Sequence, residues 1–231
     1  MNNKISIISP ADNSIIAERN LTTAKERQHI TQSSLIAQKN WNEVPITDRA
    51  ILCHKAIDYL VNNSNKLAKE ITTQMGRPIR YTPGEISGVE ERARYMIDIA
   101  QKSLMDIDLS DETTKRFIRR VPLGIVLTIA PWNYPYLTAI NSVIPALMAG
   151  NCVLLKHSKQ TLLCAERLQE AFDYADLPKG VFQYLHMNHA QSSKLLENPA
   201  IDFISFTGSY DAGMMIEKSI AGFNKGLALE L

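Results

Sequence analysis

Five short segments carry side chains that could do chemistry, and each lies at the end of an apolar run. They are "PWN" (131–133), "KHS" (156–158), "HMNH" (186–189), "TGS" (207–209) and Glu230. The amide of Asn133 can donate to an oxyanion, and the ammonium of Lys156 can hydrogen-bond ribose hydroxyls. The glycine turn at Gly208 lets a phosphate approach a helix N-terminus. With a carboxylate added, this set suits a nucleotide cofactor beside a reacting carbonyl.

The apolar runs that precede these segments alternate with helical patterns. The runs cover residues 124–130, 152–156, 181–185, 202–206 and 227–231, and the helical patterns cover 136–148, 161–175, a short stretch ending at 197, and 212–220. Such alternation predicts an α/β fold with a parallel, doubly wound sheet and helices on both faces. Because ligands bind outside the carboxyl ends of such strands, we expect the five segments to meet in one crevice.

The first hundred residues show four consecutive helical patterns. Thr23 and Glu26 form a capping box that opens the first, which runs to Trp41. The others run from about 47 to 62, from 64 to 76 and from 85 to 102. Residues 113–121 mix β-branched, aromatic and basic side chains, which favours an exposed two-stranded ribbon. We therefore predict an N-terminal helical part (1–103), a protruding hairpin (104–122) and a sheet-containing core (123–231).

The composition narrows the class of protein. The 231 residues are 45% hydrophobic and 21% charged, which is ordinary for a globular protein with a sizeable core. A net charge of +1 without a basic run argues against nucleic-acid binding. Three widely spaced cysteines argue against a disulfide framework, and no apolar run is long enough for a secretory signal or a membrane helix. We expect a soluble cytoplasmic protein.

Each candidate residue also has a plain structural interpretation. Asn133 alone would be a turn residue, Glu230 an exposed strand-end charge, and "TGS" (207–209) a helix start with a serine cap. His186 and His189 are spaced H-x-x-H but lack the third and fourth ligands that zinc needs, so no metal site is predicted. Only the ordered series of segments favours the functional interpretation.

That series resembles the NAD(P)-dependent aldehyde dehydrogenase family. The stretches "VPLGIVLTIAPWNYP", "PALMAGNCVLLKHS", "LPKGVFQYL", "IDFISFTGSYDAG" and "LALEL" follow the family's order and spacing from about Arg120 to the last residue. The stretch "QMGRP" (74–78) is similar less specifically. The resemblance implies a Rossmann-like core and makes the ribbon at 104–122 an oligomerisation hairpin. Self-association into a homo-oligomer is therefore expected.

The resemblance also implies a role for individual residues. Asn133 would stabilise the oxyanion and Glu230 would activate water, so both are catalytic candidates. The implied cofactor-binding residues are Ile129, Pro131, Trp132, Lys156, Ser158, Lys159, Gly208, Ser209 and Gly213. Within that set Lys156 would bond the adenosine ribose, and the glycines form a G-x-x-x-x-G pattern under the pyrophosphate. The implied reaction oxidises an aldehyde to a carboxylic acid with NAD or NADP as hydride acceptor.

Two positions depart from the family pattern. Lys159 stands where the family commonly has a glutamate on the ribose 2′-hydroxyl; because a cation attracts a 2′-phosphate, we hypothesise that the site accepts NADP. The alternative is that Lys159 is simply a solvated lysine before a helix. The segment "HMNH" lacks the glycines that the family often shows after its third strand, which leaves the packing around the adenine open.

The chain ends on "GLALEL", one residue before the Gly-Gly turn of the family, whose nucleophilic cysteine lies further on. Cys53, Cys152 and Cys164 fall inside strand or helix patterns and are interpreted as buried structural thiols. We therefore expect an N-terminal portion from a truncated gene, inactive and poorly soluble alone or complemented by a second chain. The alternatives are a stand-alone dinucleotide-binding module and a non-functional remnant. The identity of the aldehyde is left open.

Overall fold

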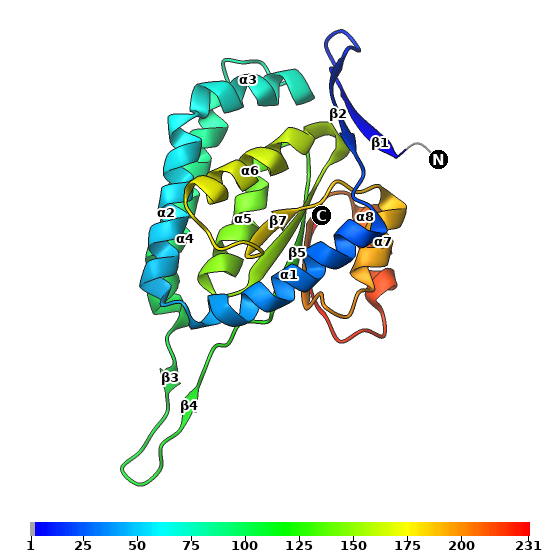
Figure 1. The fold of residues 1–231 in the computed structure, drawn as a ribbon. Helices are drawn as coiled ribbons and strands as arrows, with labels where there is room; N and C mark the ends of the chain where they lie inside the picture. Colours follow the sequence, from blue (N-terminus) through cyan, green and yellow to red (C-terminus); the bar gives the residue numbers. More distant parts are fainter. Residues whose placement is uncertain (1–2) are drawn as a thin grey trace.

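A five-stranded parallel sheet lies at the centre of the computed structural model, which describes residues 3–231 (Figure 1). Its strands are β5 (Ile125–Ala130), β6 (Cys152–His157), β7 (Phe182–Tyr184), β8 (Phe203–Thr207) and β9 (Gly226–Glu230). The spatial order is β7-β6-β5-β8-β9, with every pair parallel. The chain winds outward from β5 in one direction and then from β8 in the other. The boundary between β5 and β8 is thus a topological switch point, and the predicted doubly wound fold is confirmed.

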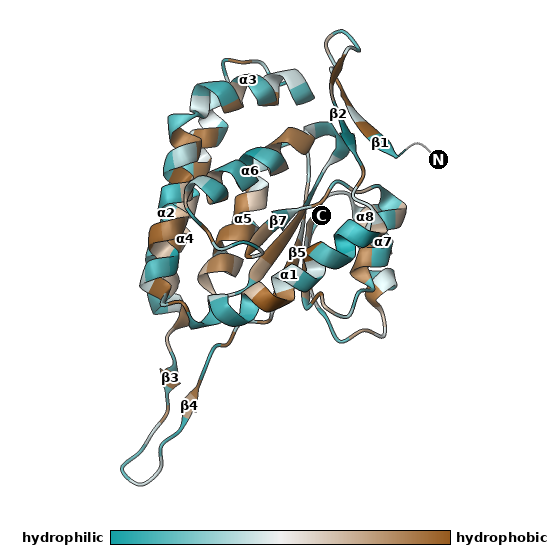
Figure 2. Cartoon of the chain, in the orientation of Figure 1, coloured by the Kyte–Doolittle hydropathy of each residue, from teal (hydrophilic) through white to brown (hydrophobic). Residues whose placement is uncertain are grey.

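Burial explains why these runs form strands. All six residues of β5 are buried, as are all residues of β6 except Lys156, so both faces of these central strands are covered. Figure 2 shows the brown central strands surrounded by helices with teal outer faces. Strand register places Ile129 opposite Lys156 and Thr207 opposite Glu230. The polar strand ends therefore emerge at one edge of the sheet.

Helices connect the strands and cover both faces of the sheet (Figure 1). The connecting helices are α5 (Pro135–Met148), α6 (Leu162–Tyr174) after a 3₁₀ turn η1 (Lys159–Thr161), α7 (His189–Leu196) and α8 (Tyr210–Ile220). The preceding helices are α1 (Ala24–Glu43), α2 (Ile46–Asn62), α3 (Ser64–Met75) and α4 (Pro83–Leu104). Most buried hydrophobic residues of α1–α4, among them Trp41, Ile57 and Val89, belong to the same hydrophobic cluster as the sheet.

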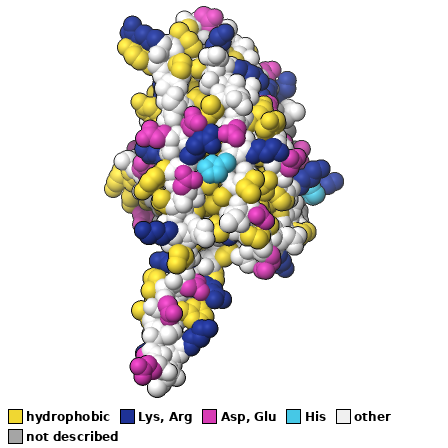
Figure 3. Space-filling view, turned by 90° about the vertical axis from the view of Figure 1, so that its left-hand side faces the viewer, with side chains coloured by type: hydrophobic (Ala, Val, Ile, Leu, Met, Phe, Trp, Pro, Cys, Tyr) yellow, Lys and Arg dark blue, Asp and Glu magenta, His cyan; other side chains and the backbone are white. Residues whose placement is uncertain are grey.

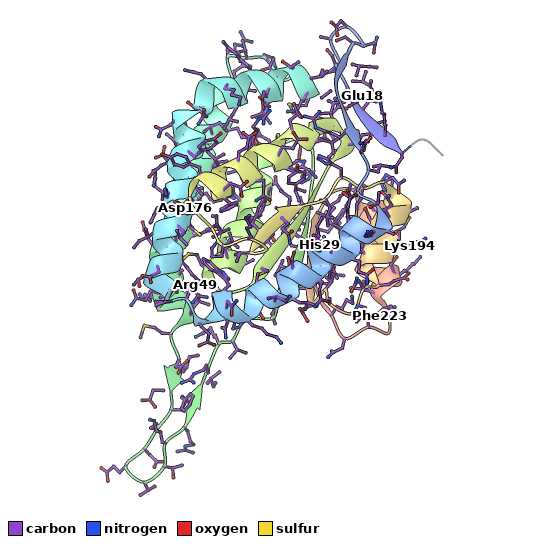
Figure 4. All side chains as sticks on the ribbon, viewed as in Figure 1. Glu18, His29, Arg49, Asp176, Lys194 and Phe223 are labelled. Carbon is purple, nitrogen blue, oxygen red and sulfur yellow. The ribbon has the colours of Figure 1, made fainter. Side chains whose placement is uncertain are left out.

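Specific polar contacts join the N-terminal helices to the core. The indole nitrogen of Trp41 donates to the carbonyl of Leu147 at 3.0 Å, which ties α1 to the end of α5. Lys55 of α2 pairs with Asp176 in the turn after α6 at 2.5 Å, at the position labelled in Figure 4. The predicted capping box of Thr23 is present at the start of α1. Gly76 ends α3 in the left-handed conformation at φ 80°, as the "GRP" pattern predicts.

Residues 4–20 form a β-hairpin, so the predicted helical part over residues 1–103 is wrong there. Strand β1 (Lys4–Ile8) pairs antiparallel with β2 (Ile15–Asn20), and Asn13 takes φ 60° in the turn between them. The alternation in "KISII" supplies the apolar face of a strand. Ile7 is fully buried and packs with Leu162 and Leu163 in a separate small cluster. The hairpin is therefore held by the start of α6.

A second hairpin protrudes from the body of the molecule. Strands β3 (Ile107–Asp108) and β4 (Phe117–Ile118) pair antiparallel, and both are exposed. This confirms the predicted exposed ribbon. Figure 3 shows hydrophobic side chains along this arm, below a helical face that carries mixed acidic and basic groups. Between α4 and α2, Arg94 pairs with Asp58 at 2.6 Å.

Two kinds of feature are absent between residues 3 and 231. No helix there combines the length and the apolar character that a membrane crossing requires. No group of three or more histidine, cysteine or acidic side chains in that range could hold a metal ion.

Candidate active site

A cleft of about 820 Å³ opens at the carboxyl ends of β5, β6, β8 and β9. Ten of the eleven predicted site residues line it, namely Ile129, Pro131, Trp132, Asn133, Lys156, Ser158, Lys159, Gly208, Ser209 and Glu230. The exception, Gly213, is not among the lining residues. Ile5 of the N-terminal hairpin and Asn188 and His189 at the start of α7 complete part of the wall. The structure thus brings strand tips far apart in the sequence into one crevice at the switch point.

Asn133 lies in the exposed loop between β5 and α5. Its side-chain oxygen accepts a hydrogen bond from the backbone N–H of Tyr134 at 3.1 Å. Its amide nitrogen has no hydrogen-bond partner among residues 3–231, so both of its N–H groups are available in the cleft. That arrangement suits a donor to a developing oxyanion.

Sequence reasoning missed two residues that hold this loop. Arg77 donates to the backbone carbonyl of Asn133 and pairs with Glu85 at 2.5 Å. Burial raises the pKa of the Glu85 carboxyl, while backbone N–H groups at the start of α5 and the Arg77 guanidinium oppose that rise. Arg77 stands in the family-like stretch "QMGRP", which was the available signal. Glu85, eight residues on, offered none.

The two lysines of the cleft differ in their surroundings. Lys156 is the last residue but one of β6 and is half-buried, and burial lowers the pKa of its ammonium. It forms no hydrogen bond or ion pair with residues 3–231, so its donors face the cleft without a protein acceptor. Lys159 is exposed at the start of η1, where the Ser158 hydroxyl accepts from the N–H of Gln160 at 3.3 Å. Along the chain, Ser158 is thus flanked by the cationic side chains of Lys156 and Lys159.

His157 lies between these residues but points away from the cleft. It is 1% exposed, and its Nε2 donates to the carbonyl of Pro135 at 2.9 Å. Its Nδ1 accepts from the N–H of Ser158 and from the Thr161 hydroxyl, both at 3.0 Å. Burial is the main cause that lowers the pKa of this imidazole to about 4. Neutral His157 therefore joins β6, η1 and the start of α5.

The glycine turn after β8 leads directly into α8. Ser209 is the N-cap residue of α8, but its side chain makes no capping bond, so the alternative of a simple serine cap gains no support. A β-carbon on Gly208 would lie 2.5 Å from the ring of Phe206, so a side chain there would displace that ring. Gly213 is buried inside α8, where a β-carbon would lie 2.4 Å from Leu231. Its position serves close packing of α8 and does not reach the cleft.

Glu230 is exposed at the end of β9. Its carboxylate accepts a hydrogen bond from the Thr207 hydroxyl at 2.9 Å, and its backbone carbonyl accepts from the N–H of Gly208 at 3.0 Å. One carboxylate oxygen thus has a fixed partner and the other does not. The side chain lies in the same cleft as Asn133.

The "HMNH" segment divides between two environments. Asn188 caps α7 through a capping box with Gln191 and lines the cleft together with His189. His186 is buried, and its Nε2 lies 3.0 Å from a carboxylate oxygen of Glu166. Spacing along the sequence gave no sign of this acidic partner, because it comes from α6.

Glu166 also binds the N-terminal hairpin. Arg19 of β2 contacts it through two nitrogens, at 2.6 and 2.9 Å. Burial alone would raise the pKa of Glu166, but the hydrogen bonds from His186 and Arg19 outweigh it and lower that pKa to about 2.

The three cysteines are buried, as predicted. Burial raises the thiol pKa of Cys53 and Cys152 to about 12, and that of Cys164 is raised as well. None of them lines the cleft. Neutral thiols in these positions are poor nucleophiles.

Comparison with known proteins extends these observations. A family model described as "Aldehyde dehydrogenase family" matches residues 1–231. A probable NADP⁺ succinate-semialdehyde dehydrogenase from Synechocystis is 32% identical over 193 residues, which are 84% of this chain and 42% of that protein. An NADP-dependent glyceraldehyde-3-phosphate dehydrogenase from Streptococcus equinus is 29% identical over 217 residues, which are 91% of this chain and 46% of that protein.

Solved structures of aldehyde dehydrogenases also superpose on this chain. The Bacillus halodurans NADP-dependent glyceraldehyde-3-phosphate dehydrogenase complexed with NADP superposes with a TM-score of 0.93 and 28% identity, covering 100% of this chain and 49% of that one. An aldehyde dehydrogenase from Bartonella henselae gives a TM-score of 0.94 and 28% identity, covering 100% and 49%. The chain spans about half the length of the relatives it matches. The chain belongs to the aldehyde dehydrogenase family.

Proposed function

We propose that this chain forms the cofactor-binding part of an enzyme that oxidises an aldehyde to a carboxylic acid with NADP⁺ as the preferred hydride acceptor. The observation that carries the proposal is the single cleft that joins Asn133, Lys156, Ser209 and Glu230 at the switch point of the sheet. A donor amide, a free ammonium, a helix start and a carboxylate together match the needs of a dinucleotide beside a carbonyl.

The residues present fit a dinucleotide. Lys156 is half-buried without a partner among residues 3–231, so ribose hydroxyls could satisfy its ammonium. The turn at Gly208 has no side chain of its own and opens onto the N-terminus of α8, where the backbone N–H groups favour an anion. Bound there, NAD(P)⁺ would supply the hydride acceptor.

The other end of the cleft suits the aldehyde. The free N–H groups of Asn133 can stabilise the oxyanion that forms when the carbonyl carbon is attacked. The carboxylate of Glu230 can take a proton from a water molecule in the hydrolytic step. Because no cysteine lines the cleft, residues 3–231 do not supply the nucleophile that the family uses.

The preference for NADP rests on Lys159. Its exposed ammonium lines the same cleft as Lys156. Glu230, the only acidic side chain among the described residues that line the cleft, lies on β9, which β5 and β8 separate from β6. A cation in that position attracts a 2′-phosphate, whereas a glutamate would repel it. Relatives named as NADP-dependent, such as the Synechocystis protein, agree with this assignment.

Isothermal titration of the full chain with NADP⁺ and NAD⁺ tests the proposal. We expect tighter binding of NADP⁺, and we expect Lys159→Glu to weaken NADP⁺ by about tenfold or more, the range of a lost charge-assisted hydrogen bond, while NAD⁺ changes little. The control is Lys194→Glu, which alters an exposed lysine of α7 outside the cleft. Equal affinity for both cofactors would remove the NADP preference, and absence of binding to either would remove the proposed function.

We also propose that the β3–β4 hairpin mediates self-association. We propose in addition that the protein is cytoplasmic. Ile107, Phe117 and Ile118 are 41–54% exposed along the arm, and an exposed strand edge with apolar side chains favours pairing with another chain. Three free thiols suit a reducing compartment. Sedimentation velocity tests the role of the hairpin: we expect the parent chain to self-associate and Phe117→Asp to do so less. A parent chain that stays monomeric at all concentrations would contradict the proposal.

A further inference from the structure

The loop that carries Asn133 needs an external support. Trp132 and Tyr134 on either side are 52% and 50% exposed, so the loop is not buried in the core. A group that stabilises a transition state must be held to within about 0.5 Å, and an exposed loop does not hold it unaided. The bond from Tyr134 to the Asn133 side chain orients the amide only relative to the loop itself.

Arg77 supplies contacts from outside the loop. One guanidinium nitrogen donates to the backbone carbonyl of Asn133. The guanidinium plane also lies over the ring of Tyr134, with 4.3 Å between its carbon and the ring centroid. Arg77 therefore contacts two consecutive residues of the loop, the backbone of Asn133 and the side chain of Tyr134.

Glu85 fixes Arg77 in turn. Its side chain is fully buried, and one carboxylate oxygen accepts from the second terminal nitrogen of Arg77 at 2.5 Å. The other oxygen accepts from the N–H of Tyr136 at 2.9 Å, which belongs to the first turn of α5. The Glu85 carboxylate thus links Arg77 to α5, the helix that follows the loop.

We propose that Arg77, held by Glu85, is the positioning residue that orients Asn133 as the oxyanion donor. The inference rests on the proposed function, because only an aldehyde reaction needs that amide in a fixed place. The two roles of the arginine require a planar fork: one nitrogen binds Glu85 while the other reaches Asn133. A lysine has one ammonium and cannot span both acceptors in this geometry.

Nuclear magnetic resonance of the ¹⁵N-labelled full chain tests the inference without any requirement for turnover. The side-chain amide signals of Asn133 are identified by their loss in Asn133→Asp. In Arg77→Lys we expect these signals to move and broaden, and we expect the Tyr134 N–H to exchange with solvent about tenfold faster. Circular dichroism and the affinity for NADP⁺ should stay close to the parent values. The control is Arg116→Lys, which alters an exposed arginine of the hairpin.

A second variant separates positioning from folding. Arg77→Met leaves Glu85 without its cation and should lower the melting temperature, whereas Arg77→Lys preserves that pair and most of the stability. Both should disturb Asn133 equally. Unchanged Asn133 and Tyr134 signals in a folded Arg77→Lys chain would overturn the inference. If the parent chain fails to bind NADP⁺, the proposed function fails, while the link between Arg77 and Asn133 is still measured independently.

Discussion

The stability of the chain should fall in mild acid because of His157. The imidazole is buried with both nitrogens engaged: Nε2 donates to Pro135, and Nδ1 accepts from Ser158 and Thr161. A second proton would place an N–H at Nδ1 against two donors, inside a site that cannot solvate the charge. The folded-state pKa is therefore lowered from 6.5 to about 4.

The sign and size of the effect follow from proton linkage. Because the pKa is lower in the folded state, the unfolded chain binds the extra proton first, and the stabilising contribution present above pH 6.5 is lost as the pH falls toward 4. The whole difference is worth about 3 kcal/mol at 1.36 kcal/mol per pKa unit. Between about pH 7.5 and about pH 5, about 2 kcal/mol of it should disappear.

Urea unfolding of the parent chain and of His157→Gln at these two pH values measures the effect. The variant should be less stable at the higher pH, because buried donors and acceptors lose their partner, by about 1–3 kcal/mol. Its stability should then fall by about 2 kcal/mol less than that of the parent on acidification. His29→Gln is the matched control, since His29 is exposed on α1 (Figure 4). An identical loss of stability in the parent and in His157→Gln would refute the reasoning.

Three further predictions concern other parts of the molecule. Glu166→Gln, which breaks the pair with Arg19, should destabilise the chain by about 2 kcal/mol in urea at neutral pH. Because the Glu166 pKa of about 2 lies below the ordinary value of 4.5, this deficit should shrink as the pH falls from 4.5 toward 2. Gly180→Val should lower the melting temperature markedly, since φ is 90° and a β-carbon would lie 2.9 Å from the carbonyl of Ser33; a change within error would contradict this. Gly208→Val should weaken NADP⁺ binding by about tenfold or more in calorimetry while the far-ultraviolet circular dichroism spectrum is preserved, because the new side chain would displace the Phe206 ring and occupy the cleft before the N-terminus of α8.

The sheet and the cleft could be predicted from the sequence because their signals are local. Each central strand is a short apolar run such as residues 124–130, and in a parallel sheet every such run must end at the same edge. Once the strands are recognised, the convergence of Lys156 and Glu230 follows without any knowledge of side-chain contacts. The helix boundaries followed for the same reason, since the capping box at Thr23 and the glycine at Gly76 act within one turn.

The supports of the cleft could not be predicted, because each joins segments far apart in the chain. Arg77 and the loop at Asn133 are 56 residues apart, and each precedes one of two helices, α4 and α5, that pack on each other. The pairing of Arg19 with Glu166 spans 147 residues and depends on a hairpin whose short strands were hidden by the strong helical patterns that follow. Position along a strand thus predicts which groups meet a ligand, whereas the groups that orient them depend on how the helices pack. Mutations at Arg77 should therefore change the orientation of Asn133, while the set of residues that line the cleft stays the same.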